Sequence, residues 1–414
     1  MPAEPQGPDR RGRIGVVPAR FGPAIIGGAE IVLRRIAAGL QDRGWDVEVL
    51  TTCAVDYFSW DNEVPAGLSQ EDGLAVRRFP VVASTAGRER DALGHRMLAG
   101  DRLTPNEQMR WLNDDVRVPE LFHHLLERSD DYRALLFGPY LFWPAFACSQ
   151  VAPERSLLWT CLHDEPYAYQ PVFEPLLSGL AGLYLQTEPE HDLAHRINGA
   201  LAPHEVVGCG VEVPTSYDPD GFRARHGIDR PFLLYAGRRE GAKGWDELLA
   251  AFARAVTRRR LPFSLVTMGA GPVVAPPGLE DRVVDLGFLP DAERDNAYAA
   301  AAAYVQPSRY EAFSRTIMES WLAGTPVIGV GEGGVVRWHI QRSQAGIVYD
   351  DEYELEEALA FVADRPELAA RIGARGRAYV LEHYQWADVL DRIEDRLDAW
   401  VPYSAESGAG AGDA

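Results

Sequence analysis

The sequence predicts an α/β protein made of two doubly wound halves, each with a parallel sheet covered by helices. Three observations support this prediction. Short β-branched runs alternate with helix-like segments along most of the chain. The alternation stops at a polar, turn-rich stretch at 214–231, which we interpret as a linker, and then restarts. The length of 414 residues suits two domains, and we expect them to face each other across a deep cleft.

The first half opens with a predicted βαβ unit. RIGVV at 13–17 is a short apolar run before a proline, a helix follows with Gly44 as its C-cap, and DVEVLTT at 46–52 forms the next strand. Such a unit implies a parallel sheet with right-handed crossovers. Residues 84–118 are polar and rich in arginine, so we predict a long loop or insert there. Further strands are expected at 134–138, 156–162, 183–187 and 205–213.

The second half repeats the alternation. An amphipathic helix is predicted at 246–259, because its apolar residues recur at helical spacing. The strands expected around it are at 232–237, 264–269, 282–287, 302–307 and 325–330.

Composition excludes several classes of protein. The net charge of −20 and the pI near 4.9 repel nucleic acid and allow at most peripheral membrane contact. No apolar run reaches the roughly 18 to 20 residues that span a bilayer, and the polar start is unlike a signal peptide. The four cysteines have no CxxC spacing, which favours reduced thiols in the cytoplasm over a disulfide framework or a zinc site.

The loop GRREGAKGW at 237–245 contains the only lysine of the chain, Lys243; all the other basic side chains among the 41 are arginine. Arg238 leaves the end of a predicted strand, and Lys243 lies five residues later, near the next helix. Two cations at this place can clamp a diphosphate, since arginine offers a planar fork and lysine a compact charge. The alternative interpretation is a solvated loop with scattered charge.

Two further segments follow predicted strand ends. Gly27 and Gly28 precede the first long helix, so their backbone can approach a ligand closely beside free helix N–H groups; a simple tight turn is the alternative. In QPSRYEAFSRTIMESWLAGTPVI at 306–328, a helix is predicted to begin near Phe313 or Ser314. Glu311 lies before it and Glu319 on it. Carboxylates accept hydrogen bonds from the vicinal hydroxyls of a ribose or a sugar, so the pair can serve one extended ligand.

At this string the chain resembles the retaining glycosyltransferases of family four, which have the GT-B fold of two facing Rossmann-like domains. The E-x7-E motif matches Glu311 to Glu319, and GGAE, GR…KG and AGTPVI match in the same order. The resemblance extends over about 14–400. It implies an acceptor-binding domain at 1–215, a nucleotide-sugar-binding domain at 216–384 and a helix at 385–400 that returns to the N-terminal domain. The tail at 401–414 has a low-complexity composition, so we expect it to be disordered.

The resemblance implies a role for each matching residue. Glu319 would accept the ribose hydroxyls and Glu311 a hydroxyl of the donor sugar. Arg238 and Lys243 would neutralise the diphosphate, and His163 would lie near the reacting sugar. The remaining donor-binding residues implied are Gly27, Gly28, Gly269, Gly271, Phe288, Leu289, Phe313, Ser314, Arg315 and Thr316.

The implied reaction moves a hexose-type sugar from a nucleoside-diphosphate sugar to an acceptor hydroxyl, with retention, no cofactor and no metal. Cations and helix N-termini stabilise the leaving diphosphate, and the acceptor attacks from the same face. Ser314 and Arg315 depart from the family pattern, which usually has glycine after Glu-Ala-Phe, and Arg315 adds a possible cation near donor or acceptor. In GVGEGGVVRWHI at 329–340 the usual acid after the glycines is missing.

Other functions remain open at this point. A nucleotide-sugar 2-epimerase shares the fold and needs no acceptor, and a non-catalytic nucleotide-sugar-binding protein would not turn over. A phosphorylase would need a lysine that binds pyridoxal phosphate. The only lysine, Lys243, is already assigned to the diphosphate, so this function is disfavoured. The acceptor is expected to be a soluble metabolite such as an aminocyclitol, or a polysaccharide intermediate, contacted by the insert at 84–118 with Trp111. The donor base and sugar, the linkage and the choice between monomer and homodimer are not specified by the sequence.

Overall fold

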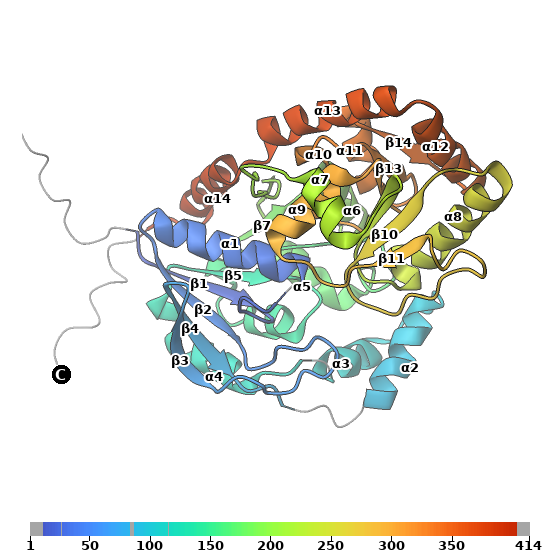
Figure 1. Cartoon of the computed structure of the whole chain (residues 1–414). Helices are drawn as coiled ribbons and strands as arrows, with labels where there is room; N and C mark the ends of the chain where they lie inside the picture. Colours follow the sequence, from blue (N-terminus) through green and yellow to red (C-terminus); the bar gives the residue numbers. More distant parts are fainter. Residues whose placement is uncertain (1–10, 26, 83–86, 115, 404–414) are drawn as a thin grey trace, which may run out of the picture. The chain divides into compact units, whose positions relative to one another are not determined.

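The computed structural model describes residues 11–25, 27–82, 87–114 and 116–403 (Figure 1). They form two compact units. The first unit combines residues 1–208 with 389–414, and the second is the continuous segment 209–388. None of the described helices is long and apolar enough to cross a membrane.

The first unit is built on an eight-stranded sheet of order β3-β4-β2-β1-β5-β6-β7-β8. All neighbours pair in parallel except β3, which is antiparallel to β4 at the edge. The strands are β1 (Arg13–Pro18), β2 (Asp46–Thr52), β3 (Gly67–Glu71), β4 (Leu74–Phe79), β5 (Ala134–Gly138), β6 (Ser156–Trp159), β7 (Gly182–Leu185) and β8 (His204–Val206). The central strands are buried apolar runs because helices cover both faces of a parallel sheet.

The helices of the first unit include α14, which reaches it from the end of the chain. Tyr184 of β7 donates a hydrogen bond to the carbonyl of Ile393 at 2.8 Å, and Gly182 leaves room for the ring of Trp400. The α-helices are α1 (Gly28–Asp42), α2 (Gly87–Leu98), α3 (Pro105–Asn113), α4 (Pro119–Arg128), α5 (Glu174–Ser178), α6 (Glu188–Ile197) and α14 (Trp386–Trp400). Single turns are η1 (Ser129–Asp131), η2 (Pro144–Cys148), η3 (Pro153–Arg155) and η4 (Pro171–Phe173).

The second unit is built on a six-stranded parallel sheet of order β11-β10-β9-β12-β13-β14. Its strands are β9 (Phe232–Ala236), β10 (Ser264–Met268), β11 (Val283–Asp285), β12 (Ala303–Gln306), β13 (Val327–Val330) and β14 (Gly346–Tyr349). Its helices are α7 (Pro219–His226), η5 (Gly241–Lys243), α8 (Trp245–Arg259), α9 (Asp291–Ala300), α10 (Arg315–Leu322), α11 (Val335–Ser343), α12 (Glu352–Asp364) and α13 (Pro366–His383).

Two predictions about irregular segments were wrong. The insert predicted as a loop at 84–118 contains α2 and α3, and its positions 84–86 and 115 lie outside the described residues. Thr104 caps α3 through a capping box with Glu107, a start signal that outweighs the polar composition. Within the predicted linker at 214–231, Asp218 caps α7, since its side chain accepts a hydrogen bond from the Gly221 N–H.

Some strands and ends also differ from the predictions. β3, β4 and β14 were not predicted, and the strands expected at 156–162 and 205–213 are shorter in the structure. Most of the tail predicted to be disordered, residues 404–414, lies outside the described residues, whereas Val401 is buried and accepts from Arg133 Nε at 2.9 Å. None of the four cysteines, which all lie within the described residues, forms a disulfide.

Helix α13 packs closely on α10 and the turn that follows it, in the second unit (Figure 1). A β-carbon at Gly376 would lie 2.2 Å from the ring of Trp321, and one at Gly373 would lie 2.3 Å from the carbonyl oxygen of Gly324. Real β-carbons do not approach this closely, so both glycines are required for the contact. Since α10 carries Glu319, the position of this candidate residue depends on the packing of α13.

We therefore expect Gly373→Ala to lower the free energy of unfolding by about 1–3 kcal/mol, since its methyl group meets rigid backbone rather than a flexible side chain. Thermal unfolding followed by circular dichroism measures the loss. Gly94→Ala, in α2, is the matched control, because the nearest heavy atom lies 3.7 Å away and alanine favours a helix by about 0.5–1 kcal/mol. Equal melting temperatures for the two variants would contradict the packing argument.

Candidate functional site

The loops that carry Lys243 and Glu311 follow two neighbouring parallel strands, β9 and β12, so they lie side by side at one edge of the sheet. They touch at Gly244, which has a φ of 70° and sits against the carbonyl of Pro307, where a β-carbon would lie 2.5 Å from the oxygen. Both the backbone conformation and the close approach require glycine here. The KG pair of the sequence is thus explained by the contact between these two loops.

The Lys243 ammonium is held over the loop after β12. Its Nζ lies 3.0 Å from Glu311 Oε1, 3.3 Å from Ser308 Oγ and 3.4 Å from the carbonyl oxygen of Tyr310. The side chains of Lys243 and Glu311 are 26% and 16% exposed, so the ion pair is partly shielded from water. A compact ammonium fits this three-sided set of oxygens, which a planar guanidinium on a different stem would not match.

Arg239, a buried residue that the sequence did not single out, joins the loop after β9 to the loop after β10 and to the end of β11. Its guanidinium donates to the carbonyl of Gly269 at 2.6 Å and pairs with Asp285. Gly269 has a φ of 125°, and its N–H donates to the carbonyl of Gly287 at 2.7 Å. Arg238, the predicted phosphate ligand, remains half-exposed, with Glu240 Oε1 at 3.1 Å.

The two segments predicted to cradle a base lie on the loops after β10 and β11. Gly271 sits close to the backbone of Arg239, where a β-carbon would be 3.1 Å from the carbonyl oxygen. Phe288 follows Gly287 and is 61% exposed, and Leu289 is half-buried. An exposed aromatic ring beside a glycine-rich turn offers a flat apolar face to another ring.

Helix α10 begins at Arg315, one or two residues later than predicted. Ser314 is the residue before it and has a φ of 65°. Gln306 at the end of β12 holds this turn by donating to Ser314 Oγ at 2.6 Å and to Thr316 Oγ1 at 3.1 Å. Phe313 is buried, with its ring centroid 4.9 Å from that of Tyr384.

Arg315 and Glu319 lie in a dense network of charges. Arg315 donates to the carbonyl of Gly210 and to Glu212 Oε2, each at 3.0 Å, and its guanidinium lies 3.8 Å from Glu319 Oε1. Glu319 is 12% exposed, with Arg294 Nε at 3.6 Å, and accepts a hydrogen bond from the hydroxyl of Tyr298 at 3.1 Å. The charge of Arg315 is therefore already engaged by these acids and the Gly210 carbonyl.

The carboxyl of Asp295 adds a titrating group beside this network. Burial raises its pKa to about 6, the charge of Arg294 opposes that shift, and the negative charge of Glu319 adds to it. Asp295 thus changes protonation near neutral pH, close to the carboxylate that the resemblance assigns to the ribose.

In the first unit, the glycine pair opens α1. Gly27 is the N-cap and Gly28 the first residue, and nothing lies within 4 Å of a β-carbon placed at Gly28. At Gly27 a β-carbon would lie 2.1 Å from Glu30 Oε2. Glu30 forms a buried ion pair of 2.6 Å with Arg20, which also donates to the carbonyl of Val55 at 2.9 Å. The sequence analysis did not predict this ion pair of Arg20 and Glu30, which fixes the first turn of α1.

His163 follows β6 and belongs to the first unit. Its side chain is 33% exposed, and its Nδ1 lies 3.5 Å from Glu165 Oε1. The loop before it is held by Glu190, a fully buried carboxyl that the sequence did not reveal. Glu190 accepts from Thr160 Oγ1 at 2.6 Å, from the N–H of Leu162 at 2.7 Å and from the N–H of Gln186 at 2.6 Å.

Burial raises the pKa of Glu190 to about 7 and outweighs its three hydrogen-bond donors and the charge of His163, which favour the ionised form. A carboxyl that titrates near neutral pH therefore lies directly under the loop that carries a candidate catalytic histidine.

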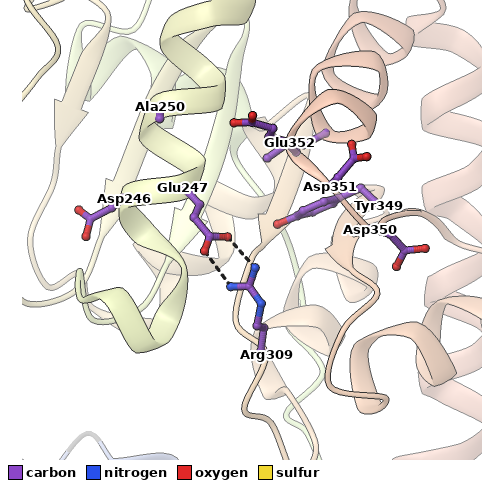
Figure 2. A pocket seen from close by; sticks show the side chains of 9 residues that line it. Asp246, Glu247, Ala250, Arg309, Tyr349, Asp350, Asp351 and Glu352 are labelled. Atoms are coloured by element: carbon purple, nitrogen blue, oxygen red, sulfur yellow. Dashed lines mark hydrogen bonds and ion pairs between the residues drawn. The ribbon is translucent and has the colours of Figure 1, made fainter. Parts of the chain in front are cut away.

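A cavity of about 450 Å³ lies at the same edge of the second sheet, between α8 and the start of α12 (Figure 2). Figure 2 shows Arg309 bonded to Glu247 on one side, with Asp350, Asp351 and Glu352 on the other. The acidic lining is unsuited to a phosphate. Lys243, Glu311 and Glu319 do not line this cavity, so it is separate from these three predicted donor ligands.

A second cavity, of about 240 Å³, lies in the first unit within the insert predicted to contact the acceptor. Its lining combines charged and polar residues with one leucine: Glu89, Arg90, Leu93, Arg110, Asn113, Asp114 and Arg117. Trp111 does not line it, because its ring is buried and stacked on Tyr167 at 5.3 Å between centroids. Trp111, which was expected to contact the acceptor, therefore packs in the core of the first unit instead.

Comparisons with known proteins agree with this architecture. Residues 220–379 match the family described as glycosyl transferases group 1. D-inositol 3-phosphate glycosyltransferase 1 of Catenulispora acidiphila is 30% identical over 237 residues, which cover 51% of this chain and 55% of that protein. The chain spans about half the length, or less, of the curated relatives it matches.

Two solved structures cover nearly the whole chain. Sucrose-phosphate synthase from Thermosynechococcus elongatus has a TM-score of 0.73 at 18% identity, covering 95% of this chain and all of that one. HepE of Anabaena, solved with UDP and glucose, has a TM-score of 0.67 at 17% identity and covers 94% of this chain. The chain thus has the predicted GT-B fold, and residues 220–379 resemble the group 1 glycosyltransferases.

The raised pKa of Glu190 gives the stability a defined pH dependence. Between the unfolded pKa, roughly 4.3, and the folded pKa of about 7, the folded chain holds a proton that the unfolded chain has lost. The free energy of unfolding should therefore fall as the pH rises through this window, by about 1.4 kcal/mol per unit from this group. Thermal unfolding between pH 5 and 8 should show this slope flattened in Glu190→Gln but retained in Glu188→Gln, an exposed control on the same helix. Identical slopes in both variants would refute the assignment.

Proposed function

We propose that this chain is a retaining glycosyltransferase that moves a hexose-type sugar from a nucleoside-diphosphate sugar to an acceptor hydroxyl in the cytoplasm. The observation that carries the proposal is the contact of 3.0 Å between Lys243 and Glu311 at adjacent strand ends. Both residues lie inside the matched glycosyltransferase domain. Glu319 follows on α10, as the E-x7-E motif requires.

The charges of the second unit suit a leaving diphosphate. Breaking the bond between sugar and phosphate builds negative charge on the nucleoside diphosphate. Lys243 and Arg238 are the cations of the loop after β9 other than the buried Arg239. The N-terminus of α10 adds its free N–H groups at the next loop. In the proposed complex the Lys243 ammonium contacts the phosphate and its ion pair with Glu311 weakens. The Glu311 carboxylate can then accept a hydrogen bond from a sugar hydroxyl.

The remaining residues take positioning roles in this proposal. Glu319 accepts the ribose hydroxyls, and Tyr298 and Arg294 hold its carboxylate in place. Phe288 offers its exposed ring to the base, and Gly27 and Gly28 leave room at the first turn of α1. His163 contacts the donor sugar. The acceptor attacks from the face that the leaving group occupies, and a phosphate oxygen takes its proton, so no metal or carboxylate nucleophile is used.

We propose a soluble, polyhydroxylated acceptor of the cyclitol class, bound at the polar cavity lined by α2 and α3. The named activity of the Catenulispora relative, on an inositol phosphate, supports this class. The cavity supplies side chains of both signs, including Arg90, Arg117 and Asp114, which suit a ring bearing several hydroxyls and a charged substituent.

Removing the lysine tests the diphosphate role. Lys243→Ala should lower kcat by about 100- to 1,000-fold, the range seen when one charge-stabilising donor is lost. Lys243→Arg should still cost at least about tenfold, because the guanidinium does not fit the oxygens of Ser308, Tyr310 and Glu311. Initial rates of transfer at saturating donor measure both.

The matched control is Arg230→Ala, which removes an exposed cation of the same unit that pairs with Asp281 at 2.9 Å. It should keep the parental kcat, and circular dichroism should show all three variants folded. Near-normal turnover by Lys243→Ala would contradict the proposed role of Lys243 in stabilising the diphosphate.

The reaction class is tested with donor sugars and acceptors in separate reactions. A panel of UDP-, GDP- and dTDP-hexoses should reveal one donor that raises the melting temperature, since a ligand of the native state stabilises it. Release of the nucleoside diphosphate should then depend on an inositol phosphate or an aminocyclitol, and the anomeric configuration of the product should match that of the donor. Conversion of the nucleotide sugar without any acceptor would instead identify an epimerase, and binding without turnover a non-catalytic protein.

A further inference from the structure

Three histidines of the first unit converge at one place outside the residues considered above. His191 and His195 are one turn apart on the same face of α6, and His204 begins the neighbouring strand β8. One ring nitrogen from each lies within 4.8 Å of the other two. The ring centroids of His191 and His195 are 4.6 Å apart, and that of His204 lies 5.2 Å from His191 and 5.3 Å from His195. We call this group the histidine trio.

The neighbours of two of these rings define which nitrogen is free to bind. His204 Nδ1 lies 2.8 Å from the carbonyl oxygen of Ala202, which can only accept, so this nitrogen carries the proton and Nε2 carries the lone pair. His191 Nδ1 lies 3.2 Å from Asp192 Oδ1 and is oriented in the same way. A carbonyl or carboxylate behind a histidine is the usual outer support of a metal ligand, where it fixes the tautomer and the ring orientation.

The ligand chemistry selects the class of ion. Three neutral imidazoles suit Zn²⁺, Co²⁺, Ni²⁺ and Cu²⁺, whereas Mg²⁺ and Ca²⁺ require oxygen ligands. Three protein ligands leave a fourth tetrahedral position for water. The trio is also accessible from solvent, because His195 is exposed and the other two rings are half-buried.

We propose that the histidine trio binds one divalent transition-metal ion of the zinc class, which joins α6 to β8. The transfer reaction proposed above has no step at this ion. The ion would hold α6 in place. This helix begins at Glu188 and carries Glu190, the residue that bonds to the loop before His163. Because the metal binds the folded arrangement, it stabilises the first unit.

The test uses the full-length chain without a purification tag, since a histidine tag would bind the same ions. After treatment with a chelator, the protein is titrated with Co²⁺ and then with Zn²⁺. We expect one Co²⁺ per chain, visible absorption of a four-coordinate ion without thiolate charge-transfer bands, and displacement by one equivalent of Zn²⁺. Absence of saturable one-to-one binding in the micromolar range, or thiolate bands from the free cysteines, would overturn the proposal.

Three variants locate the site. His195→Gln replaces an exposed ligand, so the fold should persist while the affinity for Co²⁺ falls at least about 100-fold. Asp192→Asn weakens the support behind His191 and should reduce the affinity by about 10-fold, the lower end of the effect of outer-shell changes. His123→Gln, an exposed histidine of α4, is the matched control and should bind as the parent does.

Thermal unfolding supplies a second readout that does not use activity. Zn²⁺ should raise the melting temperature of the parent and of His123→Gln, and should leave that of His195→Gln unchanged. An equal rise in all three proteins, or equal loss of binding in His123→Gln and His195→Gln, would show that the ion binds elsewhere and would refute the assignment.

Discussion

The ion pair between Lys243 and Glu311 is the interaction on which the rest of the candidate site depends. It exists because β9 and β12 are neighbours in a parallel sheet, which brings two loops that are 68 positions apart in the chain to the same edge. Gly244 lets the loops touch, and the hydroxyl and carbonyl of the second loop fix the ammonium. This contact gives a reason for a lysine at position 243, although all the other Lys and Arg positions of the chain hold arginine.

Both units support their candidate residues with buried groups that never reach the surface. Arg239 joins the loop after β9 to the loop after β10 and to the end of β11, and Gln306 fixes the turn before α10. In the first unit, Arg20 with Glu30 orders the start of α1, while Glu190 orders the loop before His163. Each of these side chains is buried and hydrogen-bonded to the loop or turn that it supports, which favours one arrangement of that segment.

The sequence predicted the fold class and most strands, because buried parallel strands are short apolar runs that need no tertiary information. It also singled out Lys243 through the GR…KG motif, and Glu311 and Glu319 through the E-x7-E motif, as candidate residues. It could not reveal Arg239 or Glu190, because one buried Arg or Glu is indistinguishable from a surface one until its partners are known. The helices α2 and α3 were missed for a related reason: Trp111 and Leu112 are buried among otherwise polar positions. The spacing of HDLAH on α6 was visible in the sequence, but His204 completes the trio only through the pairing of β7 with β8.

The packing of α14 has a consequence for the order of assembly during synthesis. The second unit is a continuous segment that is complete once residue 388 has left the ribosome, whereas the first unit needs residues from both sides of it. Strand β7 cannot make its contacts with Ile393 and Trp400 until the last helix emerges. The C-terminal unit can therefore finish folding before the N-terminal one, the reverse of the usual order for chains folding as they are translated. A chain that ended at residue 388 would hold every residue of the second unit but would lack the segment that completes the first.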